Sequence, residues 1–228
     1  MYTLYIANKN YSSWSLRPWI LMRELGIGFE ERLVPFNTPG YPAFSSFSPT
    51  AKVPCLHDGA ERIWDSLSIA EYLAERHKGV WAEDPRARAY SRSAAAEIHS
   101  GFGALRDICS MTCGQRIKLH SVSDALRKDL ERLSSLWGEG LQRFGGPFLA
   151  GPKFTAADAF YCPVAFRAQT YGLALPAHAA DYVKRLLALK GMREWYDAAM
   201  RETWRDPPHE DEVSRFGTVL EDYRLVIA

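Results

Sequence analysis

The hydrophobic pattern of the chain changes near residue 80, and this change constrains the fold more than any other feature. Before it, short runs of β-type residues alternate with helical segments. After it, apolar residues recur at helical spacing through most of the remaining chain. Apolar residues make up 47% of the sequence, enough to bury a core in each part. The pattern predicts a mixed α/β unit followed by a helical unit.

The first part is predicted to fold as β-α-β-(α)-β-β-α, a small mixed sheet with helices. Its first helix is expected to end at Gly26, and the last two strands to turn at Asp58-Gly59. In chain order, we predict a strand at 2–7, a helix at 15–25, a strand at 29–36, a loop with a short irregular helix at 37–50, two strands within 53–65 and a helix at 66–77.

The second part is predicted to be helical after a linker at 81–90. The two domains are therefore expected at residues 1–80 and 86–228. Thr155 and Asp158 form the T-x-x-D pattern of a capping box. The predicted helices span 86–116, 121–144, 155–171, 179–189 and 191–204, and the acidic run at 209–212 is expected to be a solvated loop.

Charge and cysteine content exclude several classes of protein. The formal net charge is +1, which argues against nucleic acid as the partner. No apolar run is long enough to span a membrane, and the N-terminus lacks a signal-peptide pattern, so we expect a cytoplasmic protein. Cys109 and Cys113 lie four apart on a predicted helix without further ligands, so we expect no metal site. His99 has no partner nearby in the sequence and is expected on a helix surface.

Three serines gather where the first predicted strand gives way to a helix. Ser12, Ser13 and Ser15 fall within four positions, and Pro18 follows in the first turns of the helix. Ser15 suits a helix cap, because a serine hydroxyl can accept from free backbone N–H groups at a helix start. A hydroxyl beside a helix N-terminus can also donate to an anion held there.

The stretch around Val53-Pro54 has two interpretations. It could be a simple boundary between a loop and a strand, since proline is tolerated where a strand opens. It could also hold a cis Val53-Pro54 bond that exposes the backbone N–H and C=O of Val53 to an extended peptide.

Asp65 and Ser66 stand at the start of a predicted helix and also have two interpretations. Ser66 is a good N-cap residue on structural grounds alone. The pair could also bind a zwitterion, with the helix start and Ser66 on its carboxylate and Asp65 on its ammonium group.

Four motifs in this order resemble those of the cytosolic glutathione transferases. They are S-S-x-S-x-R at 12–17, K-V-P-x-L at 52–56, D-S-x-x-I-x-x-Y-L at 65–73 and F-T-x-A-D at 154–158. The first motif is most similar to the serine-type classes, in particular the zeta class. Trp14 stands where zeta-class enzymes have a cysteine, a departure from the pattern of maleylacetoacetate isomerases.

The resemblance implies a thioredoxin-like first domain, an all-α second domain and a homodimer that conjugates glutathione to a small apolar electrophile. Ser13 is then expected to meet the thiol, with Ser12 as the alternative. The glutathione site would comprise Lys52, Val53, Pro54, Asp65 and Ser66, and the electrophile site Tyr11, Trp14, Phe102 and Cys109. Two alternatives stay open: a glutathione-dependent cis-trans isomerase, or a binding protein that has kept the fold without turnover.

Overall fold

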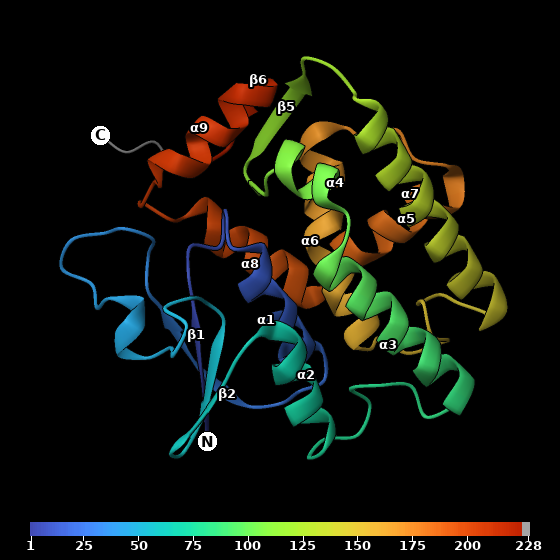
Figure 1. Cartoon of the computed structure of the whole chain (residues 1–228), viewed down its shortest axis with the longest axis horizontal. Coiled ribbons are helices and arrows are strands. Elements are labelled where there is room, and N and C mark those ends of the chain that lie inside the picture. Colours follow the sequence, from blue (N-terminus) through green and yellow to red (C-terminus); the bar gives the residue numbers. More distant parts are fainter. Residues whose placement is uncertain (225–228) are drawn as a thin grey trace.

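The computed structural model describes residues 1–224 and comprises an N-terminal α/β domain and a helical C-terminal part (Figure 1). The N-terminal sheet has the strand order β2-β1-β3-β4, with β1 parallel to β2 and antiparallel to β3. Its strands are β1 (Tyr2–Ile6), β2 (Phe29–Leu33), β3 (Cys55–Asp58) and β4 (Glu61–Ile63). The predicted fold class is confirmed.

Two α-helices complete this domain, α1 (Ser13–Glu24) and α2 (Ser66–Ala74), together with a short 3-10 helix, η1 (Phe44–Ser46). The predicted order of elements is therefore correct. The hairpin turn lies one residue later than predicted, because Asp58 and Glu61 pair across it and Gly59 takes a φ of +59°. A positive φ suits glycine, which has no Cβ to clash.

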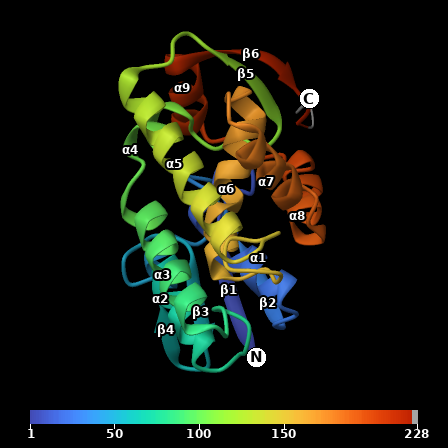
Figure 2. The same cartoon turned by 90° about the vertical axis from the view of Figure 1, so that its right-hand side faces the viewer.

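The C-terminal part is built around one central helix, α6 (Figure 2). Every residue of α6 except Gln169 is buried, and the helix packs against α1, α3 and α7. It therefore connects the core of the helices to the N-terminal domain. The helices are α3 (Pro85–Ser100), α4 (Gly103–Ile108), α5 (Asp124–Arg143), α6 (Ala156–Tyr171), α7 (Ala177–Leu187), α8 (Lys190–Met200) and α9 (Pro207–Phe216).

The predicted helix at 86–116 is wrong in its second half. The chain leaves α3 at Gly101, where a Cβ would lie 2.8 Å from the carbonyl oxygen of Glu97, and Phe102 takes a left-handed φ of 55°. After the short helix α4, the chain forms a strand, β5 (Gln115–Leu119). Gly101 and Gly103, which flank this turn, were the sequence signals against one long helix.

Three further details differ from the prediction. Strand β5 pairs with β6 (Gly217–Asp222) in a second, two-stranded sheet that the sequence did not predict. The acidic run at 209–212 belongs to helix α9 rather than to a loop, since Pro207 and Pro208 fit a first helical turn. Likewise, part of the expected linker is helical, because Asp84 caps α3.

The capping box that Thr155 and Asp158 were predicted to form at the start of α6 is confirmed. Asp158 Oδ2 accepts the Thr155 N–H at 2.9 Å, and its Oδ1 accepts the Leu149 N–H at 2.9 Å. A buried carboxylate thus joins the helix start to the preceding loop. Among residues 1–224, no helix combines the length and the hydropathy needed to cross a membrane.

Candidate active site

The serine-rich turn lies between β1 and α1 and is fixed from both sides. Ser12 immediately precedes α1, and its N–H donates to the Asn8 carbonyl at 2.8 Å. The carboxylate of Glu202, far along the chain, accepts the N–H groups of Lys9 and Asn10 at 2.5 and 3.1 Å. The turn is therefore held by the helical part as well as by its own strand and helix.

The hydroxyls of the three serines have different partners. Ser12 Oγ donates to Ser15 Oγ at 2.6 Å, and Ser15 Oγ also accepts the Ala7 N–H at 3.3 Å. Ser13 Oγ instead accepts from Arg167 Nη2 at 3.4 Å. Ser15 is not the predicted helix cap, because α1 begins at Ser13 and Ser15 anchors the turn from inside the helix. Within residues 1–224, the hydroxyl hydrogens of Ser13 and Ser15 both lack an acceptor, but Ser15 is completely buried and its oxygen already accepts two hydrogen bonds.

The Val53-Pro54 peptide bond is cis, as the second interpretation of this stretch predicted. Pro54 is buried and Val53 is half-buried, directly before β3. Lys52 is exposed. The three predicted residues therefore lie together at the start of the strand, and Lys52 is the most exposed of them.

The helix cap at the start of α2 is not the residue that the sequence predicted. Asp65, not Ser66, is the N-cap, and its Oδ1 accepts the Leu67 N–H at 2.9 Å. Ser66 is the first residue of the helix and is completely buried. Its hydroxyl has no hydrogen-bond partner within residues 1–224. A buried hydroxyl without a partner costs about 1–3 kcal/mol, so a polar ligand at this point would remove a penalty.

A chain of polar contacts leads from α2 to α1. Asp65 Oδ2 lies 3.2 Å from His99 Nε2, and His99 Nδ1 lies 3.5 Å from Arg17 Nη1. The expectation that His99 occupies a helix surface is therefore wrong, since it connects the two parts of the protein. Burial lowers the pKa of His99, and the nearby Asp65 carboxylate offsets only part of this shift.

Tyr11 lies at the edge of the serine-rich turn but is covered by the C-terminal segment. Its hydroxyl donates to Glu210 Oε1 at 2.5 Å and accepts from Arg224 Nη1 at 3.0 Å. The ring stacks on His209 with centroids 5.0 Å apart. Only 4% of Tyr11 is exposed, so the structure does not leave it free to line an electrophile site.

The other three predicted electrophile residues differ in exposure. Phe102 and Cys109 are buried at the two ends of α4, and burial raises the pKa of the Cys109 thiol to about 12. Trp14 is half-buried, and its indole packs edge-on against His99 and under the guanidinium of Arg17, 4.1 Å from the ring centre. Of this set, only Trp14 presents part of its side chain to solvent.

Sequence reasoning missed the charged residues that the helical part brings to this site. Arg106, Arg167 and Glu202 belong to no motif, and each reaches the serine-rich turn or its neighbours only through the tertiary fold. One signal was present: Arg167 is the one basic residue in the otherwise largely apolar sequence of α6. A charge on a helix of this kind is rarely buried without a partner.

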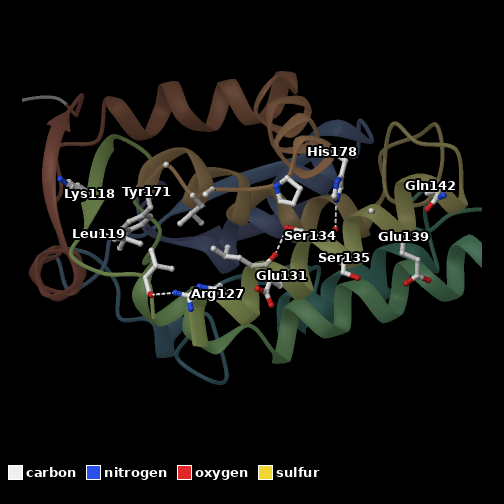
Figure 3. Close-up of a pocket in the computed structure, with 17 residues that line it drawn as sticks. Lys118, Leu119, Arg127, Glu131, Ser134, Ser135, Glu139, Gln142, Tyr171 and His178 are labelled. Atoms are coloured by element: carbon white, nitrogen blue, oxygen red, sulfur yellow. Dashed lines mark hydrogen bonds between the residues drawn. The ribbon is translucent and has the colours of Figure 1, made fainter. Parts of the chain in front are cut away.

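A large groove of about 1070 Å³ lies elsewhere, between α5 and the segment that follows α6. Figure 3 shows Lys118 and Tyr171 at one end of it and Gln142 at the other. His178 closes one side, with Nε2 3.0 Å from the Ser134 carbonyl oxygen. The groove contains none of the residues predicted to bind glutathione or the electrophile.

Comparison with known proteins relates this part of the chain to the glutathione S-transferases. Residues 11–76 match the glutathione S-transferase N-terminal domain, which covers the serine-rich turn, the cis bond and the start of α2. The chain is 23% identical over 186 residues to the glutathione S-transferase-like protein OpS6 of Beauveria bassiana, covering 78% of this chain and 81% of the relative. It is 28% identical over 144 residues to a maleylacetoacetate isomerase of Rhizobium meliloti, covering 57% and 64%.

Solved structures show the same fold. A glutathione transferase homologue of Burkholderia with bound glutathione superposes with a TM-score of 0.65 at 24% identity, covering 87% of this chain and 97% of that one. An unclassified glutathione S-transferase of Bombyx mori gives a TM-score of 0.69 at 20% identity, covering 94% and 97%. Together with the motif matches, the fold defines a glutathione transferase architecture. Residues 11–76 are thus similar to the glutathione S-transferase N-terminal domain, and the whole chain has the fold of these proteins.

Proposed function

We propose that this protein is a glutathione transferase that conjugates the glutathione thiolate to small, largely apolar electrophiles. The N-terminal domain binds glutathione in an extended form, and the helical part supplies the electrophile site. The observation that carries this proposal is the Ser13 hydroxyl, which stands at the start of α1 with its oxygen held by Arg167 and its hydrogen free to donate to a sulfur.

The energy required for thiol activation matches what this turn can provide. A free thiol has a pKa of about 8.5, and lowering it by about 2 units requires about 2.7 kcal/mol of preferential stabilisation of the anion. A hydrogen bond to a charged group contributes about 1.5–3 kcal/mol. The N-terminus of a helix contributes about 0.3–1 kcal/mol more. One serine at the start of α1 is therefore sufficient to lower the thiol pKa by about 2 units.

The remaining contacts of glutathione are proposed at the sites that the motifs indicated. Its backbone pairs with Val53 beside the cis bond, near Pro54 and Lys52. Its γ-glutamyl carboxylate meets the N-terminus of α2 and the unpartnered hydroxyl of Ser66, while Asp65 faces the ammonium group. Support comes from the fully buried Ser66 Oγ, which has no acceptor or donor of its own among the described residues.

In the proposed reaction, the thiol proton leaves to solvent and the thiolate attacks an electrophilic carbon. A carbon–sulfur bond forms as the bond to the leaving group breaks with its electron pair. The test is conjugation of glutathione to 1-chloro-2,4-dinitrobenzene, measured by the absorbance of the thioether product. We expect enzyme-dependent turnover that Ser13→Ala reduces strongly and Ser12→Ala reduces less. Turnover equal to the uncatalysed rate with every electrophile tried would refute a transferase function.

One alternative has specific support. The 28% identity to a maleylacetoacetate isomerase favours a cis-trans isomerase, in which glutathione adds to a double bond and then leaves. Trp14 in place of the zeta-class cysteine argues against it. Net consumption of glutathione separates the two, because a transferase depletes the thiol and an isomerase regenerates it. Tight glutathione binding with neither activity would identify a non-catalytic binding protein.

A further inference from the structure

Three arginines from different helices converge beside Ser13, and we call them the arginine cluster: Arg17 on α1, Arg106 on α4 and Arg167 on α6. Arg167 donates to Ser13 Oγ at 3.4 Å. The guanidinium carbons of Arg17 and Arg106 lie 4.1 and 5.3 Å from the centre of the Trp14 ring. The cluster therefore surrounds the point where the thiol is proposed to react.

The positive charges of the cluster have no carboxylate partner of their own. Within residues 1–224, none of the three arginines forms an ion pair. Arg167 Nε donates to the Cys109 carbonyl at 2.7 Å, and Arg106 Nη1 to the His99 carbonyl at 3.0 Å. These carbonyls stand near helix C-termini and offset part of the charge, but neither carries a full negative charge.

Arg17 is the least satisfied member of the cluster. It is 2% exposed, its Nε has no hydrogen-bond partner among the described residues, and Nη1 approaches only the His99 ring. The charge of Asp65 acts on Arg17, but this carboxylate faces His99 and caps α2 instead. Burial, and then the charges of Arg167 and Arg106, lower the pKa of Arg17 to about 9, so it is still cationic at neutral pH.

Such an arrangement is costly without an anion. Burying a charge without a counter-charge is strongly unfavourable, and like charges placed together add repulsion. The cation–π contacts of Arg17 with Trp14 and Phe160 offset only a small part of this unfavourable energy. Because the cluster adjoins the proposed sulfur position, the missing negative charge is expected from a ligand bound there.

We propose that the electrophile is an aromatic or unsaturated acid, and that Arg106 and Arg17 bind its carboxylate while its apolar part lies against Trp14. This proposal rests on the function proposed above and narrows its substrate class. Arg106 is the half-buried member and so the first that an entering ligand reaches. Arg167 is already engaged by Ser13 and Cys109 and stays with the thiol.

A carboxylate of glutathione is the other possible source of the negative charge. The structure favours the electrophile, because the γ-glutamyl end has its own proposed site at Ser66 and Val53. The cluster instead faces Trp14, which is not part of that site. A substitution in the arginine cluster distinguishes the two sources. If the cluster binds the electrophile, the substitution changes the preference between acidic and neutral electrophiles. If the cluster binds glutathione, the substitution lowers the affinity for glutathione.

The test uses a matched pair of ligands, 4-chloro-3-nitrobenzoate and its amide. Binding of each is measured by calorimetry with S-methylglutathione present, because this analogue cannot react. In turnover with glutathione itself, sulfur bonds to the ring carbon at position 4 and chloride leaves with the electron pair of the C–Cl bond. The wild type should bind the acid at least about tenfold more tightly than the amide, the effect of one charge-assisted contact.

Three variants assign this preference to the cluster. Arg106→Gln should reduce the preference for the acid about tenfold, and Arg106→Lys should keep part of it because the charge stays. Arg143→Gln is the charge-matched control, since Arg143 is exposed at the end of α5 and pairs with Glu139. It should leave the preference unchanged.

The outcomes separate this proposal from the proposed function. Equal binding of acid and amide by the wild type, or a preference that survives Arg106→Gln, overturns the anionic-electrophile proposal. Loss of affinity for S-methylglutathione in Arg106→Gln with an unchanged preference also overturns it and assigns the cluster to glutathione. A clear preference for the acid, with no conjugation of either compound or of 1-chloro-2,4-dinitrobenzene, supports the anion site and instead overturns the transferase function.

Discussion

Arg167 Nη2 lies 3.4 Å from Ser13 Oγ, although 154 residues separate the two in the sequence. Arg167 comes from α6 and Ser13 begins α1, and these helices pack directly against each other. An oxygen that already accepts from a guanidinium can direct its own hydrogen elsewhere. The contact therefore both orients the proposed catalytic hydroxyl and places a positive charge next to it.

Ser13→Ala should raise the pKa of the bound glutathione thiol by about 1–2 units, the loss of one hydrogen bond to an anion. Turnover at neutral pH should fall and partly recover at high pH, where the thiol ionises unaided. Titration of the thiolate absorbance against pH measures this shift. Ser12→Ala is the matched control, because its hydroxyl is engaged by Ser15. A titration that moves in Ser12→Ala and not in Ser13→Ala would reverse the two roles.

Arg167→Met should raise the same thiol pKa by about 1 unit, because it removes both a charge and the group that orients Ser13. Arg167→Lys should keep part of the effect, since it retains the charge but loses the forked geometry. The measurement is again the thiolate titration, with affinity for S-methylglutathione as the second readout. If Arg167→Met lowers turnover while the titration stays in place, Arg167 acts on structure and not on the thiol.

Ser66→Ala should weaken glutathione binding by about 1–3 kcal/mol, because a charged carboxylate loses a donor. The ligand-free protein should not become less stable, since the Ser66 hydroxyl has no partner to lose within the described structure. Calorimetry and urea unfolding test the two parts separately. Ser91→Ala is the matched control: Ser91 is equally buried, but its hydroxyl donates to the Ala87 carbonyl at 2.7 Å. It should cost stability and leave affinity unchanged. Unaltered affinity in Ser66→Ala would remove this residue from the glutathione site.

Local sequence signals were sufficient for the N-terminal domain. The strands and helices there follow hydrophobic periodicity. The cis Val53-Pro54 bond was one of the two interpretations that the sequence left open, and the structure decided between them. The error at the α2 N-terminus is also local. Asp65 and Ser66 are both good caps, and only the backbone geometry decided that Asp65 takes the role.

The remainder of the site depends on contacts between distant segments, which periodicity does not report. Arg167 reaches the turn because α6 packs against α1, and Arg106 extends from α4 to the Trp14 ring. Glu202 reaches it because the chain after α8 returns to residues 9 and 10. The sheet β5–β6 escaped prediction for the same reason: its two strands are far apart in the sequence. Short segments of this kind become strands only when a partner lies alongside.

The C-terminal segment provides a last prediction, on pH. Glu210 accepts from Tyr11 and Arg224, which joins α9 and the segment after β6 to the serine-rich turn. Burial alone would raise the pKa of Glu210, but the hydrogen bonds from Arg224 and Tyr11 lower it below its ordinary value of 4.5. A carboxylate with a lowered pKa in the folded state stabilises the protein above its unfolded pKa. This contribution is lost as the pH falls through the folded pKa.

Glu210→Gln should therefore destabilise the protein by about 1–3 kcal/mol near neutral pH, the value of hydrogen bonds to a charged group. The difference from wild type should shrink as the pH falls below the ordinary pKa of 4.5 and through the lower folded pKa, because the wild-type carboxylate then protonates and loses the same contacts. Urea unfolding at each pH measures the difference. Glu61→Gln, at an exposed carboxylate in β4, controls for the loss of one negative charge. A Glu210→Gln difference that stays constant down to the lowest pH would show that Glu210 stabilises the segment by packing and not by its charge.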